Sequence, residues 1–217
     1  MIRSIRDMDL SGKRVLTRVD FNVPQDEAGN IIDDTRITES LPTIRTILEA
    51  GGMPVLMSHL GRPKGQRKVK YSLRPVAAYL AGLMPEVNVV FAEDCIGPIA
   101  MTTIEEAPAG SIVVLENLRY YEEEEANDPA FCRQLAVLGD VYCNDAFGTA
   151  HRAHASTTGV ATLFSERCAG LLLKKELEYL GSALASPKRP FVAVIGGSKI
   201  SGKIDVIRTL MTSCDTI

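Results

Sequence analysis

The chain has 217 residues, of which 46% are hydrophobic and 24% are charged, and this balance excludes disordered and collagen-like proteins. A net charge of −3 provides no general positive field for nucleic acid or for an anionic membrane. Five scattered cysteines without a C-x-x-C pair favour reduced thiols, and no apolar run approaches the roughly 18 residues of a membrane helix. We therefore expect a cytoplasmic protein that binds neither nucleic acid nor membranes.

Short apolar runs rich in β-branched residues alternate along the chain with helix-like segments. The runs that predict buried strands are 14–19, 53–57, 87–91, 111–115, 140–143 and 191–195. The periodicity and the boundary residues predict helices over 35–50, 72–84 and 128–138, and a hairpin over 22–33. This alternation predicts an α/β fold with a mostly parallel sheet and helices on both of its faces.

Two further segments carry expectations of their own. Four successive glutamates at 122–125 predict a solvated loop or helix start, because like charges repel and need water. Residues 171–185 predict one long helix, which the Pro-rich segment 186–190 ends. We expect a first domain over 1–170, a connecting helix and linker over 171–189, and the start of a second domain over 190–217.

Basic and polar side chains follow four of the predicted strands. Ligands of open α/β sheets bind outside the carboxyl ends of the strands, so these residues should share one edge. They are Asp20, Asn22, His59, Arg62, Arg119 and Arg152, with Arg36 at the start of the first long helix. Any one of these arginines alone is more often solvated or ion-paired than bound to a ligand. Together their guanidinium groups suit a small molecule that carries both phosphate and carboxylate.

Arg36 is the most informative of these residues. A cation in the first turn of a helix is opposed by the helix dipole unless an anion lies nearby. His151 and His154 form an H-x-x-H pair, but no cysteine or acidic residue accompanies them at zinc spacing. We expect no metal site there.

The segment 197–203, GSKISGK, matches the phosphate-loop template G-x-x-x-x-G-K through its lysine. Ile204 stands where such a loop needs Ser or Thr to hold Mg²⁺, so an unrelated phosphate-loop NTPase is disfavoured. A glycine turn that opens a helix still suits phosphate. Lys199 and Lys203 lie four residues apart, which places both ammonium groups on one helix face.

Seven segments together resemble the phosphoglycerate kinase family. They are RVDFNVP (18–24), DDTRI (33–37), SHLGRPKG (58–65), LENLRYY (115–121), NDAFGTAHRAHAS (144–156), KKELEYL (174–180) and GGSKISGKI (196–204). They occur in the family's order and nearly cover the chain. The resemblance implies two Rossmann-like lobes joined by a helix, in a protein that is usually a monomer. The first lobe would bind 3-phosphoglycerate or 1,3-bisphosphoglycerate, and the second Mg-ATP or Mg-ADP.

The resemblance also implies residue roles. The glycerate substrate would be held by Asp20, Phe21, Asn22, Arg36, His59, Leu60, Gly61, Arg62, Arg119 and Arg152. Arg36 and Lys199 would flank the phosphoryl group in transfer, and Lys203 would contact the nucleotide phosphates. The reaction implied is reversible phosphoryl transfer between 1,3-bisphosphoglycerate and ADP, a step of glycolysis.

Length is the main departure from the family, whose chains are nearly twice as long. We expect most nucleotide contacts and the acidic Mg²⁺ ligand to come from the part of the family sequence that has no counterpart here. The 217-residue chain should therefore keep much of the glycerate site but have little or no kinase activity. The alternative is a phosphoglycerate- or anion-binding module that performs no turnover.

Overall fold

The computed structural model describes residues 2–185, 187–196 and 204–217. The chain divides into two compact units, Met1–Lys174 and Lys175–Ile217. Helix α8 (Leu171–Ala185) begins in the first unit and continues in the second, with the bounds predicted from the sequence. Among the described residues, no helix is both long enough and apolar enough to cross a membrane.

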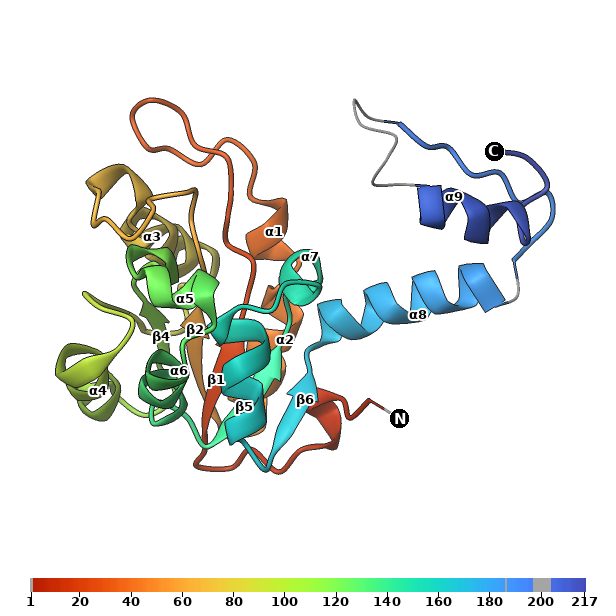
Figure 1. Ribbon diagram of the computed structural model, residues 1–217. Helices are drawn as coiled ribbons and strands as arrows, with labels where there is room; N and C mark the ends of the chain where they lie inside the picture. Colours follow the sequence, from red (N-terminus) through yellow and green to blue (C-terminus); the bar gives the residue numbers. More distant parts are fainter. Residues whose placement is uncertain (1, 186, 197–203) are drawn as a thin grey trace. The chain divides into compact units, whose positions relative to one another are not determined.

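The first unit is built on a sheet of six parallel strands (Figure 1). They are β1 (Arg14–Arg18), β2 (Met53–Met57), β3 (Val89–Ala92), β4 (Ile112–Leu115), β5 (Val141–Asn144) and β6 (Arg167–Ala169). Their order across the sheet is β3-β4-β2-β1-β5-β6, so β1 lies between β2 and β5 near the centre. The predicted parallel sheet is confirmed. The sequence missed β6, which has only three residues and begins with the exposed Arg167.

Helices cover both faces of this sheet. The first unit contains α1 (Thr35–Thr38), α2 (Leu41–Glu49), α3 (Arg74–Leu83), α4 (Gly97–Glu106), α5 (Glu122–Ala126), α6 (Pro129–Ala136) and α7 (Phe147–Ala150). Single turns connect them: η1 (Ile5–Asp7), η2 (Val69–Tyr71), η3 (Leu118–Tyr120), η4 (Ala155–Gly159) and η5 (Val160–Leu163). Helix α4 was not predicted, because Gly97-Pro98 resembles a loop signal. Proline is nevertheless tolerated in the first turn of a helix.

The alternation of side chains along each strand separates two apolar layers. On β2, Val55 and Met57 pack in the cluster that contains residues of α4 and α6. Leu56, between them, packs in the cluster that contains residues of α1, α2 and α3. Successive strand side chains point to opposite faces, so buried strands of this kind are apolar throughout. The first unit is therefore a three-layer, Rossmann-like α/β fold.

The helix predicted over 35–50 is two helices. Helix α1 ends at Thr38, and α2 begins at Leu41 with Pro42 in its first turn. Proline has no backbone N–H to donate to the preceding turn, so the hydrogen-bond ladder stops there. The hairpin predicted over 22–33 is present as a bridge between Gln25 and Ile31.

The second unit contains the rest of α8 and helix α9 (Ile204–Met211). The strand predicted over 191–195 is not formed. Val192 makes an isolated parallel bridge to Thr216 instead, and the Asp215 carboxylate accepts hydrogen bonds from Phe191 N and Arg189 Nη1. Among the described residues this segment has no other β-pairing, so the bridge remains isolated. Lys199 and Lys203 lie outside the described residues.

Candidate functional site

The carboxyl ends of β1, β2, β4 and β5 meet at one edge of the sheet, because all of the strands are parallel. Asp20 and Asn22 follow β1, and His59 and Arg62 follow β2. Arg119 lies in η3 after β4, whereas Arg152 follows α7 after β5. Most of the polar residues predicted from the sequence therefore lie at this edge, directly after the strands.

Arg36 and Asp20 are held together. The Arg36 Nη1 atom donates a hydrogen bond of 2.5 Å to Asp20 Oδ2. Asp20 Oδ1 also accepts from the backbone N–H of Asn22, which fixes the turn after β1. The Asp20 carboxylate is thus an anion close to the first turn of α1, where Arg36 would otherwise be opposed by the helix dipole.

Gly61 forms a tight turn at the same edge. Its φ angle is +62°, and an added Cβ would lie 2.5 Å from a ring carbon of Tyr71, so only glycine fits. Asn22 Oδ1 accepts from Gly61 N at 2.8 Å, and Arg119 Nη1 donates to Gly61 O at 3.0 Å. Two of the predicted residues therefore hold the turn that carries a third.

Arg18, the last residue of β1, was not predicted as part of the site. The residue is 1% exposed. Arg18 Nε donates to Ser156 Oγ at 2.8 Å, Nη1 donates to Val19 O, and Nη2 lies 3.1 Å from His59 Nδ1. The only signal in the sequence is a second arginine at the end of a strand, β1, whose other members include the apolar Val15 and Leu16.

The prediction of a solvated glutamate run is wrong for Glu124. This residue is fully buried in α5, and its carboxylate accepts from both Ser156 N and Ser156 Oγ, at 2.9 and 2.6 Å. Burial lowers the pKa of Arg18, whereas the negative charge of Glu124 opposes that shift. A buried carboxylate and a buried guanidinium are thus joined through one serine, which is how buried charges are usually accommodated.

Positive charge accumulates around His59. Burial, followed by the charges of Arg18, Arg119, Arg152 and Arg36, lowers the pKa of His59 to about 2. The Arg152 guanidinium forms no hydrogen bond or ion pair with any residue that the structure describes, and Arg119 Nε is buried without a partner. Several cations, not all neutralised, therefore surround a neutral imidazole, an arrangement that favours an anionic ligand.

The other predicted residues are Phe21, Leu60 and Arg62, and their side chains differ in burial. The side chains of Phe21 and Leu60 are buried in the apolar core, so they would reach a ligand only through their backbone. Arg62 is exposed, and it makes no hydrogen bond or ion pair within the described parts of the chain. No group of three or more His, Cys, Asp or Glu residues suited to a metal ion occurs among the described residues.

Asp145, which directly follows β5 at the same edge, binds the start of α8. The fully buried carboxylate accepts from Leu172 N and Leu173 N at 2.9 and 3.2 Å, while Thr43 Oγ1 accepts from Leu171 N. Burial raises the pKa of Asp145 to about 6, while hydrogen bonds to Asp145 from the Thr43 side chain and from the backbone of Leu173 and Leu172 oppose the shift. Asp145 directly precedes the segment that leads through α7 to Arg152, so it connects the site to the connecting helix.

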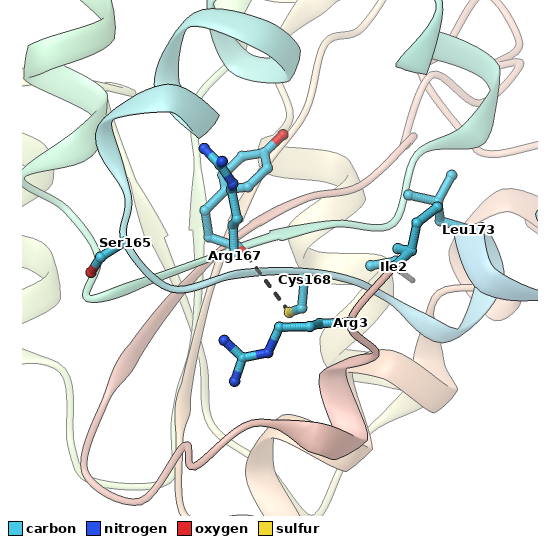
Figure 2. A pocket seen from close by; sticks show the side chains of 8 residues that line it. Ile2, Arg3, Ser165, Arg167, Cys168 and Leu173 are labelled. Atoms are coloured by element: carbon cyan, nitrogen blue, oxygen red, sulfur yellow. Dashed lines mark hydrogen bonds between the residues drawn. The ribbon is translucent and has the colours of Figure 1, made fainter.

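A hollow of about 400 Å³ lies elsewhere in the first unit, at the edge formed by β6 (Figure 2). Its lining residues are Ile2, Arg3, Tyr142, Ser165, Arg167, Cys168, Ala169 and Leu173. The Cys168 thiol donates to Tyr142 O inside it. None of the predicted site residues lines this hollow, so we do not assign the function to it.

Comparison with known proteins decides the family. The family model described as phosphoglycerate kinase matches residues 5–217, nearly the whole chain. The chain belongs to the phosphoglycerate kinase family. The phosphoglycerate kinase of Pelodictyon phaeoclathratiforme is 56% identical over 215 residues, which cover 99% of this chain and 54% of that protein. That of Chlorobium limicola is 54% identical with the same coverage.

Solved phosphoglycerate kinase structures agree. That of the Coxiella burnetii enzyme matches with a TM-score of 0.85 and 37% identity, over 99% of this chain and 53% of the other. The Pyrococcus horikoshii enzyme matches with a TM-score of 0.83 and 33% identity, over 98% and 53% respectively. The chain therefore spans about half the length of the phosphoglycerate kinases that it matches.

Proposed function

We propose that this chain carries the glycerate site of a phosphoglycerate kinase. The reaction would be reversible phosphoryl transfer between 1,3-bisphosphoglycerate and ADP, giving 3-phosphoglycerate and ATP. In this proposal, residues 1–170 form the glycerate-binding domain, 171–189 form the connecting helix and linker, and residues from 190 onward begin the nucleotide-binding domain.

The observation that carries the proposal is the group of cations around His59. Burial and four arginines lower the pKa of this imidazole to about 2, and Arg152 has no anionic partner among the described residues. A ligand with a phosphate and a carboxylate would supply the missing negative charge. Guanidinium groups bind both kinds of oxygen pair in a bidentate way.

The chain's own residues would act by positioning and by charge neutralisation, which phosphoryl transfer mainly requires of a protein. Asp20, Asn22 and His59 would orient the hydroxyl and carboxylate oxygens of the glycerate. Arg36 and Lys199 would neutralise the phosphoryl group in transfer, and Lys203 would contact the nucleotide phosphates. The substrate carboxylate is itself the acceptor oxygen, so no protein nucleophile is needed.

Mg-ATP or Mg-ADP is the cofactor that the family implies. The described residues contain no group of three acidic or histidine side chains suited to the metal ion, so they do not fit a magnesium site by themselves. The roles proposed for this chain are therefore limited to glycerate contacts and to the two lysines, Lys199 and Lys203. The second candidate is an anion-binding module without turnover, which the glycerate site alone would support.

Calorimetry of the 217-residue chain with 3-phosphoglycerate and, separately, with ADP tests the proposal. We expect 3-phosphoglycerate to bind with micromolar to millimolar affinity and to be displaced by inorganic phosphate only weakly. ADP binding without 3-phosphoglycerate binding would overturn the assignment. A coupled assay of ATP formation from 1,3-bisphosphoglycerate separates kinase from module, and we expect little or no turnover from this chain.

A further inference from the structure

Arg18 is the one arginine of the cation group that is already fully engaged. Each of its three side-chain nitrogens has a partner: Ser156 Oγ for Nε, Val19 O for Nη1 and His59 Nδ1 for Nη2. It is 1% exposed, at the end of a central strand. A guanidinium with partners at all three nitrogens orients the neighbouring side chains and is not free to bind a ligand.

The contact with Arg18 determines which nitrogen of His59 carries the proton. Arginine has only donors, so His59 Nδ1 has to accept across the 3.1 Å contact. A neutral imidazole that accepts at one nitrogen donates at the other. The ring therefore carries its hydrogen on Nε2, and the surrounding cations keep it from taking up a second proton.

His59 Nε2 is left available. It makes no hydrogen bond with any residue in 2–185, 187–196 or 204–217. It is also not among the fully buried side-chain atoms without a partner, which in the described parts are Gln25 Nε2, Arg119 Nε and Asp145 Oδ2. An unpartnered donor that retains solvent contact, in a cluster of cations, is suited to an anionic oxygen.

Ser156 and Glu124 hold Arg18 in place. The single hydroxyl proton of Ser156 goes to Glu124 Oε1 at 2.6 Å, so the serine oxygen can only accept from Arg18 Nε. Ser156 N donates to the other carboxylate oxygen at 2.9 Å. The direction of every hydrogen bond from Glu124 to His59 is therefore fixed.

We infer that Glu124, Ser156 and Arg18 form a positioning chain that holds His59 as a neutral Nε2–H donor to an oxygen of the bound ligand. This inference rests on the proposed function only for the identity of the ligand, a phosphorylated glycerate. The tautomer is a property of the ligand-free protein. None of the three residues needs to touch the substrate, so they are positioning residues and not catalytic ones.

Nitrogen-15 NMR of the histidine side chains in the whole chain tests the inference without any substitution. We expect His59 to give the pattern of a single Nε2–H tautomer that is unchanged between pH 5 and 8. The exposed His151 serves as the internal reference for a ring that is not held. An Nδ1–H pattern, or protonation of His59 within this range, would overturn the inference.

Ser156→Ala tests whether the chain holds the ring. Removing the link between Glu124 and Arg18 should abolish the single-tautomer pattern and weaken 3-phosphoglycerate binding about five- to tenfold, the effect of about one hydrogen bond. The matched control is Ser111→Ala, a buried serine that precedes β4 and bonds to Asn88, which should leave the His59 signals unchanged. If Ser156→Ala folds and His59 keeps its pattern, the positioning chain is wrong.

The two proposals fail in different ways. If the Nε2–H tautomer is observed but 3-phosphoglycerate does not bind, the proposed function fails and the tautomer stands. If 3-phosphoglycerate binds while His59 is an Nδ1–H tautomer, the proposed function stands and this inference fails.

Discussion

The Arg36 guanidinium and the Asp20 carboxylate form an ion pair of 2.5 Å between the first turn of α1 and the segment after β1. The Asp20 side chain is 16% exposed and that of Arg36 is 50% exposed, so the carboxylate is the more enclosed partner. In the ligand-free protein Asp20 therefore supplies the anion that Arg36 needs. A bound phosphorylated ligand would compete for the same guanidinium.

Arg36→Ala should weaken 3-phosphoglycerate binding by at least about tenfold, because a charge-assisted hydrogen bond contributes about 1.5–3 kcal/mol. The free energy of unfolding should change by less than about 1 kcal/mol, since the pair is partly exposed. Calorimetry and urea denaturation measure the two quantities. Arg45→Ala is the matched control, because it removes a 2.6 Å surface pair with Glu86. Equal dissociation constants for the two variants would contradict the role of Arg36.

Gly61→Ala should destabilise the protein by at least about 2 kcal/mol, the cost of a left-handed residue together with overpacking. The φ angle of +62° and the 2.5 Å approach of an added Cβ to the Tyr71 ring are the physical reasons. Gly82→Ala is the control: Gly82 lies in α3 with open space around it, and alanine there should stabilise by up to about 1 kcal/mol. Urea denaturation of both variants compares them, and similar effects would exclude the strained turn.

Asp145 should make stability depend on pH. Its pKa rises from 3.8 to about 6 on burial, so the folded state takes up the proton more readily than the unfolded state. The stabilising effect of that proton appears as the pH falls through 6 and is lost as the pH rises through it. Relative to Asp145→Asn, the wild type should therefore gain about 1 kcal/mol between pH 7.5 and pH 5. A difference that stays constant with pH in urea denaturation would show that Asp145 does not titrate there.

Added salt should weaken 3-phosphoglycerate binding, because mobile ions screen the cations around His59. The dissociation constant should rise several-fold between about 10 mM and 300 mM NaCl, over which the Debye length falls from about 30 Å to below 8 Å. Arg152→Ala should reduce this dependence with little loss of stability, since the guanidinium has no partner within the described chain. Arg133→Ala, an exposed arginine on α6, is the control and should leave the salt dependence unchanged.

Local patterns were sufficient to predict most of the first unit and to predict which candidate residues lie at one edge of its sheet. Apolar runs predict strands of a sheet that is covered on both faces. Helix α8 has the bounds that the sequence predicts. Polar residues that follow parallel strands necessarily meet at one edge, so Asp20, His59 and Arg119 could be grouped from the sequence alone.

Contacts between distant segments could not be predicted. Arg18 and Ser156 are 138 residues apart, and Ser156 and Glu124 are 32 apart, so no local pattern indicates that these charges are buried together. Glu124 belongs to a run of glutamates whose composition alone indicates solvent exposure. The short β6 and the break at Pro42 depend on pairing and on hydrogen-bond geometry that periodicity does not report.

The low basicity of His59 keeps this ring neutral near neutral pH. Burial and the charges of the surrounding arginines lower the pKa of His59 to about 2, so the ring does not titrate near neutral pH. The ligand does titrate, since the second ionisation of a phosphate monoester lies near pH 6. Changes in affinity across the physiological range would then report the dianionic fraction of the ligand, and acidification of the medium would weaken binding without altering the charge of His59.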